Sequence, residues 1–188
     1  MIQETLITTV NAKGVPHIAP MGVHVQDQQI VILPFKPALT LDNLLETKTA
    51  VINYCDDVRI FAGCLTGRRD WPLLPAERVK GSYLADTLAH AELTLERIED
   101  DAVRPKLFCK AIHTVNHKPF QGFNRAQYSV LEAAILISRL GRLPWEKIET
   151  ELNYLRTGLE KTGGDREWQA WGWLMEAVEL HRQRGGFS

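Results

Sequence analysis

The chain has 188 residues, of which 45% are hydrophobic and 24% charged, and its formal net charge is -1. This composition is typical of a folded globular protein and excludes a disordered or fibrous chain. Because no basic excess is present to attract a polyanion, we expect no nucleic-acid partner. No apolar run approaches the roughly 20 residues that cross a bilayer, so we also expect no membrane association.

The cellular compartment is indicated by the first residues and by the cysteines. Residues 1–5 contain an acid and no Lys or Arg before a short alternating segment, which is unlike a signal peptide. The three cysteines are widely spaced and include no Cys-x-x-Cys pair, so neither a disulfide framework nor a thiolate zinc site is expected. The sequence therefore predicts a cytoplasmic protein.

The beginning of the chain has the alternation of β-strands. Residues 5–10 and 17–26 alternate on either side of a turn at 12–14, which predicts a hairpin. Residues 30–35 are apolar at both odd and even positions, as in a strand that is covered on both faces. We expect this strand to be central.

A short helix and a further strand are predicted next. Thr40 is placed to cap the helix, and residues 49–54 read as a strand. Asp56 and Asp57 have the chemistry of a turn or a helix cap. The charged, Pro-containing segment 67–78 is expected at the surface.

Two more strands complete a set of about six. Residues 107–115 are the expected partner of residues 90–96, joined through an acidic turn. The alternation in 90–96 predicts an antiparallel strand with one face in solvent. Its polar face carries His90, Glu92, Thr94 and Glu96.

The pattern changes from strands to helices near Phe120, which divides the chain into residues 1–120 and 121–188. Asn124 with Gln127, Pro144 and Asp165 mark the starts of three helices. Each helix has one apolar stripe that must pack on a partner. The stripes are Leu131, Ala134, Ile135 and Leu140; Ile148, Leu152, Leu155 and Leu159; and Trp168, Trp171, Met175 and Val178.

A family resemblance is found in residues 4–57. Residues 4–9 and 14–23 resemble the first hairpin of the FMN-binding split barrels, a superfamily that includes flavin reductases and pyridoxamine-phosphate oxidases. Residues 33–44 and 50–57 resemble the segments that follow. The chain is most similar to a branch of this superfamily that is a domain of unknown function. The resemblance implies a mainly β fold with α-helices: an antiparallel split β-barrel of Greek-key type with about six strands, followed by about three C-terminal helices.

The resemblance also implies FMN as the cofactor, with FAD, F420 or haem as the flat ligands of related barrels. A phosphate needs anion donors, and Lys36, Thr40 and Asn43 provide a cation, a helix start with a hydroxyl, and an amide. The alternative is that Thr40 is only a helix cap and that Lys36 is only a solvated cation.

The flavin ring needs a thin slot lined by backbone. Pro20, Met21, Gly22 and Val23 form a strand whose glycine exposes backbone groups, and Met21 can lie against a flat ring. Alternatively, Gly22 marks a bulge or bend of the barrel.

Other candidates are placed near the cofactor by the resemblance. These are Thr8, Phe35, Asn53 and Asp56, although an Asp pair at 56–57 is also an ordinary turn. No catalytic side chain is identified. His113 and His117 lie in a segment that reads as strand and loop, without an acid or Cys at ligand spacing, so no metal site is expected.

These features favour an FMN-dependent oxidoreductase in which hydride passes through flavin N5 to or from a small-molecule substrate or electron donor. The alternative is a non-catalytic flavin-binding carrier, sensor or scaffold protein. The resemblance further implies a homodimer, because barrels of this superfamily commonly complete their flavin sites across a two-fold interface.

Overall fold

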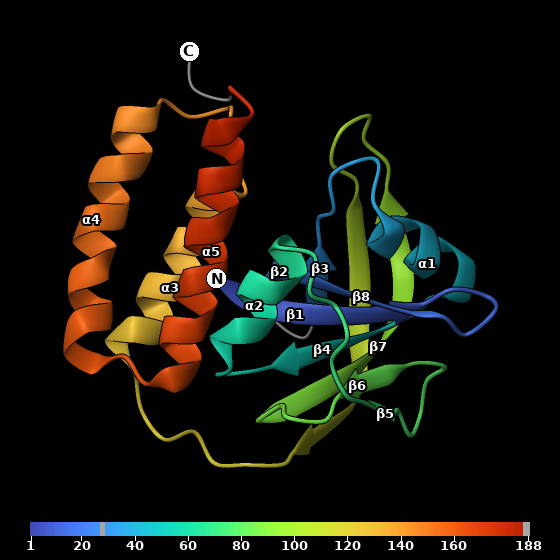
Figure 1. Cartoon of the computed structure of the whole chain (residues 1–188). Helices are drawn as coiled ribbons and strands as arrows, with labels where there is room; N and C mark the ends of the chain where they lie inside the picture. The colour runs from blue at the N-terminus through green and yellow to red at the C-terminus, as the bar shows by residue number, and fades with distance from the viewer. Residues whose placement is uncertain (27–28, 186–188) are drawn as a thin grey trace. The chain divides into compact units, whose positions relative to one another are not determined.

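The computed structural model describes residues 1–26 and 29–185, which form two compact units (Figure 1). The first unit comprises Met1–Cys55 and Trp71–Phe120. The second comprises Asp56–Asp70 and the chain from Gln121 onward. Residues 56–70 therefore cluster with the C-terminal helices, whereas a division of the sequence at residue 120 leaves them with the strands.

The first unit is built on a closed antiparallel barrel, as expected from the sequence. Its strands follow the order β1–β2–β3–β8–β7–β4, and β4 pairs with β1 to close the barrel. All neighbouring strands are antiparallel. The strands are β1 (Ile2–Val10), β2 (Pro16–Gln26), β3 (Gln29–Ile32), β4 (Thr49–Tyr54), β7 (Ala89–Glu99) and β8 (Lys106–Asn116).

Alternate apolar residues of these strands fill the barrel core. Ile7, Val23, Ile52, Leu93 and Leu107 are each fully buried in one cluster, which is the outcome expected for strands with a period of two. The third strand is shorter than the predicted 30–35, because Pro34 has no N–H to donate to a ladder.

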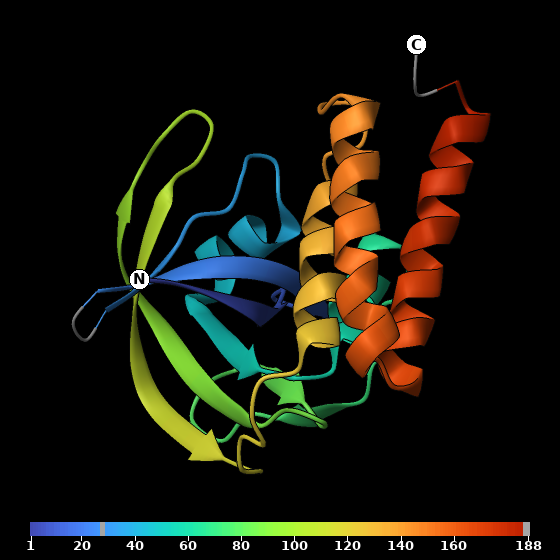
Figure 2. The same ribbon diagram turned by 90° about the vertical axis from the view of Figure 1, so that its left-hand side faces the viewer.

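The hairpin of β7 and β8 is long and strongly bent (Figure 2). Its register shifts between Glu92 and Leu93 and again between Leu95 and Arg97. Each such bulge increases the local twist and bends the strand. The bends let the hairpin follow the curved wall of the barrel, where β7 pairs with β4 at residues 89–94 and β8 pairs with β3 at residues 107–110.

A second, smaller sheet lies in the segment between β4 and β7. It consists of β5 (Leu73–Pro75) and β6 (Ser82–Leu84), which pair with each other and were not predicted from the sequence. β6 contacts β1 and β4 of the barrel. Residues 74, 77 and 78 are exposed, as expected for this surface segment.

The helix α1 (Leu39–Thr47) follows β3, but Thr40 does not cap it. The N-cap is Ala38, whose side chain accepts no hydrogen bond, and Thr40 is buried in the first turn. The predicted cap was wrong because the helix starts two residues earlier than a cap at Thr40 requires. The side chains of Leu41 and Leu44 then pack into the barrel core.

The second unit consists of helices around one apolar core. Helix α3 contacts the other three helices, and no helix in the described part of the chain has the length and apolar character to cross a membrane. Asn124 caps α3 by accepting from the amides of Ala126 and Gln127, as predicted. The helices are α2 (Val58–Leu65), α3 (Arg125–Ile137), α4 (Trp145–Thr162) and α5 (Asp165–Gln183).

The predicted apolar stripes of these helices are correct to different degrees. In α4, Ile148, Leu152, Leu155 and Leu159 are all buried. In α5, Trp171 and Val178 are buried, whereas Trp168 is 42% exposed. Of the stripe predicted for α3, Ala134 is buried and Leu140 packs against the core, whereas Leu131 and Ile135 are only half-buried. The buried surface of α3 is wider than this stripe, since three helices contact α3. That surface consists of Ala126, Ser129, Val130, Ala133, Ala134, Leu136 and Ile137.

Helices α3 and α4 cross closely at Gly158. A Cβ atom at this position would lie 2.5 Å from Ser129 Oγ and 3.3 Å from the carbonyl oxygen of Arg125. The second contact is with backbone, which cannot rotate away. A glycine is therefore required where the two helices cross.

We expect Gly158→Ala to lower the free energy of unfolding by about 1–3 kcal/mol, since the added methyl group overpacks the crossing. Gly172→Ala in α5 is the matched control, because a Cβ there meets no atom within 4 Å. It should raise the free energy of unfolding by about 0.5–1 kcal/mol through helix propensity. Chemical denaturation measures both values, and equal effects would contradict the close crossing.

Candidate functional site

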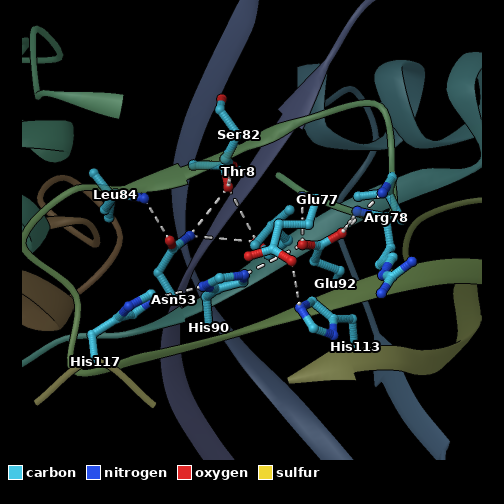
Figure 3. A network of polar contacts seen from close by, with 12 residues as sticks. Thr8, Asn53, Glu77, Arg78, Ser82, Leu84, His90, Glu92, His113 and His117 are labelled. Carbon is cyan, nitrogen blue, oxygen red and sulfur yellow. Dashed lines mark hydrogen bonds and ion pairs between the residues drawn. The ribbon is translucent and has the colours of Figure 1, made fainter. Parts of the chain in front are cut away.

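A network of polar side chains lies on the outer face of β1, β4 and β7, under the segment that carries β5 and β6 (Figure 3). Thr8 Oγ1 donates to the carbonyl oxygen of Ser82 at 2.5 Å. Asn53 Nδ2 donates to Thr8 Oγ1 at 3.1 Å, and Asn53 Oδ1 accepts from the Leu84 amide at 2.7 Å. Both side chains therefore attach β6 to the barrel.

The carboxylate of Glu92 holds the segment before β6. Its oxygens accept from the amides of Glu77 at 2.8 Å, Arg78 at 2.7 Å and Val79 at 2.9 Å. The side chain of Glu92 is completely buried. A buried carboxylate needs such donors, because it has lost the water that would otherwise solvate its charge.

Two histidines extend this network towards solvent. His90 Nε2 lies 3.4 Å from Glu92 Oε1, and His90 Nδ1 lies 2.8 Å from His117 Nε2. The Tyr83 ring stacks on His90 with the ring centroids 4.1 Å apart, and on His117 at 5.1 Å. His90 is 1% exposed, whereas His117 is exposed. The network thus connects a buried carboxylate with the protein surface.

The surroundings shift the ionisation of both buried groups. Burial alone would raise the pKa of Glu92, but the three backbone amides and His90 outweigh it and hold this pKa below its usual value. Burial lowers the pKa of His90, assisted by His117 and His113, although the hydrogen bond to Glu92 opposes this change. The result is a charged Glu92 beside a neutral His90 near pH 7.

The residues proposed for the phosphate of a flavin lie around the start of α1. Lys36 Nζ is 2.7 Å from Asp100 Oδ1 in the turn between β7 and β8. Asn43 is buried, and its amide donates to Thr9 Oγ1 at 3.0 Å. Thr40 is close to the first-turn amides of α1, which have no side-chain cap.

Phe35 precedes this group and is 61% exposed. The guanidinium carbon of Arg104 lies 4.7 Å from the centre of its ring. Arg104 Nε also donates to the carbonyl oxygen of Leu33 at 3.0 Å. The sequence did not single out Arg104, which adds a second cation to the loop that leads into α1.

Two of the four residues proposed for the flavin ring have side chains that pack in or against the barrel core. Val23 is completely buried and Met21 is packed against the barrel core, while Pro20 is exposed. A Cβ atom on Gly22 would lie 3.0 Å from Glu4 Oε1 and 3.1 Å from Ile2 Cγ2. Exposed side chains of β1 therefore lie close to this glycine, which is paired with Glu4 in the barrel ladder.

Asp56 and Asp57 have different environments. Asp56 is half-buried, and Asp57 is the N-cap of α2, where its carboxylate accepts from the Arg59 amide at 3.0 Å. Arg59 Nη2 also lies 2.6 Å from Asp57 Oδ2, and Arg166 Nη1 lies 3.7 Å from the same oxygen. The cap predicted for this pair is thus Asp57.

The sequence did not identify the network of His90, Glu92 and His117. The expectation of a solvent-exposed polar face for residues 90–96 was wrong at His90 and Glu92, since the segment between β4 and β7 covers them. One feature of the sequence could have indicated the network. His90 and Glu92 are two titratable residues on the same face of one strand, and a long segment between two strands precedes them. Among the described residues, no group of three or more His, Cys, Asp or Glu is arranged to hold a metal ion.

The fold and this network define a closed six-stranded antiparallel barrel protein that carries a separate helical unit. The family model described as "protein of unknown function (DUF447) N-terminal domain" matches residues 3–118, and the C-terminal model of the same family matches residues 124–176. The chain belongs to the DUF447 family. No curated protein is significantly similar to it.

Solved structures share this fold. An FMN-bound DUF447 protein from Methanosarcina mazei is 20% identical over 94% of each chain, with a TM-score of 0.80. The 2-nitrobenzoate 2-nitroreductase of Pseudomonas fluorescens is 21% identical over 61% of this chain and 64% of its own, with a TM-score of 0.53. An NADH:FAD oxidoreductase of Streptomyces globisporus is 13% identical over 62% and 75%, also with a TM-score of 0.53. The barrel fold expected from the resemblance is confirmed.

We expect the free energy of unfolding to fall as the pH drops below the ordinary His value of 6.5. The pKa of His90 is lowered in the folded chain. Between this pKa and the ordinary one, His90 is therefore protonated in the unfolded chain and neutral in the folded chain. Stability is lost by up to about 1.4 kcal/mol per pH unit until the folded pKa is reached. Urea denaturation at several pH values measures this loss.

His90→Gln should remove most of this pH dependence, while His24→Gln on β2 should leave it in place. A second loss is expected below the ordinary Glu value of 4.5, because the pKa of Glu92 is also lowered and its protonation weakens the bonds to residues 77–79. Stability that is independent of pH between 7.5 and the acid range would contradict the buried neutral state of His90.

Proposed function

We propose that the chain is a flavoprotein that binds FMN without a covalent bond and acts as an oxidoreductase on a small substrate. One observation carries this proposal: the FMN-bound DUF447 protein matches over 94% of both chains with a TM-score of 0.80. The nitroreductase and the NADH:FAD oxidoreductase that share the barrel support a redox role. Bound FMN would supply hydride transfer at flavin N5.

The start of α1 fits the phosphate group of FMN. The first-turn amides of a helix have no partners within the helix, and here no side chain caps them. These amides carry the positive end of the helix dipole, which favours an anion. In our proposal, the phosphate lies against them, with the Thr40 hydroxyl as an additional donor.

Lys36 is available for the same anion. Its pair with Asp100 is exposed to solvent, with 36% of the Lys36 side chain and 82% of the Asp100 side chain accessible. Exposed ion pairs contribute little to stability, so a dianionic phosphate competes readily for the ammonium group. The proposal therefore retains Lys36 as a phosphate-binding residue.

Apolar side chains beside this loop support a site that is completed by another molecule. Phe35 is 61%, Leu39 60% and Val103 59% exposed, and the amide of Lys36 donates to the carbonyl oxygen of Val103. Exposed apolar side chains that lie together commonly mark binding or association surfaces. We propose that the flavin ring and a second copy of the chain cover them in a homodimer, and that the protein acts in the cytoplasm.

The phosphate assignment is tested by comparing FMN with riboflavin, which lacks the phosphate. We expect wild-type protein to bind FMN with flavin absorption bands retained after dialysis. Lys36→Ala combined with Thr40→Ala should weaken FMN binding at least about tenfold and leave riboflavin binding unchanged. Flavin fluorescence titration measures both affinities.

Lys13→Ala, in the turn between β1 and β2, is the control for a general loss of positive charge and should leave both affinities as they are. Equal FMN affinity in the double variant would remove the phosphate assignment. Absence of FMN binding by the wild-type protein would refute the proposed function. FMN binding without reduction by NADH or NADPH would instead favour a flavin carrier or sensor.

The dimer is tested by light scattering of the FMN-loaded protein at micromolar concentration. The expected result is twice the monomer mass. Val103→Asp combined with Leu39→Asp places charges on the exposed apolar side chains and should shift the protein towards monomer, because burying unpaired charges is costly. A wild-type protein that is monomeric at all concentrations would refute this part of the proposal.

A further inference from the structure

The turn between β7 and β8 is attached to the segment 33–38, which leads from β3 into α1. Within the turn, Asp101 Oδ1 accepts from the amide of Val103 at 2.8 Å and from the amide of Arg104 at 2.6 Å. The carbonyl oxygen of Val103 accepts from the amide of Lys36 at 2.8 Å. These bonds fix the backbone of Arg104 beside the segment 33–38.

The side chain of Arg104 is held by the same segment. Its Nε donates to the carbonyl oxygen of Leu33 at 3.0 Å, and its guanidinium carbon lies 4.7 Å from the centre of the Phe35 ring. One hydrogen bond and one cation–π contact therefore orient the guanidinium group. A planar group that is already oriented loses little conformational freedom when it binds a ligand.

The charge of Arg104 is left without a carboxylate in the described part of the chain. Lys36 pairs with Asp100, and Asp101 accepts from backbone amides. The Nη1 and Nη2 atoms of Arg104 form neither a hydrogen bond nor an ion pair with any of the described residues. Arg104 itself is exposed. The turn thus presents an oriented guanidinium group whose two terminal nitrogens are available to an anion.

This guanidinium belongs to the same neighbourhood as the start of α1. The amide of Lys36 is bonded to Val103, which precedes Arg104, and α1 begins three residues after Lys36, at Leu39. Three residues of chain span at most about 11 Å. The phosphate position proposed at the start of α1 and the turn that carries Arg104 are therefore neighbours.

We propose that Arg104 binds the phosphate of FMN through Nη1 and Nη2 and makes the site selective for a phosphate monoester. This inference rests on the proposed function. A phosphate monoester carries a charge of about −1.5 to −2 at pH 7 and has three terminal oxygens. The planar guanidinium group matches two of these oxygens, while Lys36 and the helix amides serve the rest.

The same donors suit FAD less well. Each phosphate of FAD is a diester with one negative charge and two terminal oxygens, because a second ester or anhydride bond takes up the third. A site with two cations and the first-turn amides of α1 offers more charge and more donors than one such diester can use. The site should therefore bind FMN more tightly than FAD.

The test compares FMN, FAD and riboflavin, which share the ring and the ribityl chain and differ beyond them. Arg104→Gln should weaken FMN binding at least about tenfold and FAD binding less than about threefold, and should leave riboflavin binding unchanged. Arg104→Lys keeps the charge but loses the planar group, so its FMN affinity should lie between those of wild type and Arg104→Gln. Flavin fluorescence titration measures the affinities, and circular dichroism shows that both variants are folded.

Arg97→Gln on β7 is the matched control. The guanidinium carbon of Arg97 also lies over a phenylalanine ring, 3.6 Å from the centre of Phe108, but Arg97 pairs with the carboxylate of Glu99. Its charge is therefore already neutralised within the chain. This variant should bind all three flavins as the wild type does.

The outcomes separate this inference from the proposed function. Wild-type FMN affinity in folded Arg104→Gln overturns the role of Arg104 and leaves the proposed function in place. An equal loss for FMN and riboflavin also overturns it, because Arg104 would then only hold the segment 33–38. A wild-type protein that binds FAD as tightly as FMN contradicts the selectivity. Failure of the wild-type protein to bind FMN refutes the proposed function instead.

Discussion

One buried carboxylate determines how the outer face of the barrel is covered. Glu92 has no contact with solvent, and its charge is satisfied mainly by three consecutive backbone amides of residues 77–79. These amides reach the carboxylate only when the chain between β4 and β7 folds back over the strands. Hydrogen bonds from Thr8 and Asn53 then secure β6 on the same face. A strand face that would otherwise be solvated thus becomes a polar interior, where unpaired groups are costly.

The helical unit depends on a different kind of constraint, which is shape. Its core is apolar, and the three helices around α3 approach it at distances that small side chains permit. Gly158 on α4 lies so close to Ser129 and Arg125 on α3 that a Cβ atom would not fit. This unit also holds a buried charge, Asp57, which caps α2 and pairs with Arg59 and Arg166. The cover of the barrel is thus fixed mainly by hydrogen bonds to a buried charge, whereas the helical unit is fixed mainly by the fit of its side chains.

Local patterns in the sequence predicted most elements, because alternation and helical spacing follow from burial on one face. The four apolar residues of the stripe predicted in α4, from Ile148 to Leu159, are all buried and illustrate this. Prediction failed where burial comes from distant chain: His90 and Glu92 have a surface pattern but lie under residues 77–83. Thr8 and Asn53 show the same limit for the site, since their chemistry was recognised but not their bonds to β6. No local signal specifies such partners.

The closure of the barrel also restricts how copies of the chain can associate. Every barrel strand has a neighbour on both sides, and β4 pairs with β1. Where strands pair on both sides, the sheet offers no free edge to a strand of another molecule. β2 pairs with β3 only at His24–Gln26, and β8 pairs with β3 only at Leu107–Lys110, so residues 16–23 and 111–116 have a strand neighbour on one side only. The pair of β5 and β6 also has edges, but each strand has only three residues, which is short for strand addition. Closure therefore protects the doubly paired stretches of the barrel against growth into extended cross-molecular sheets.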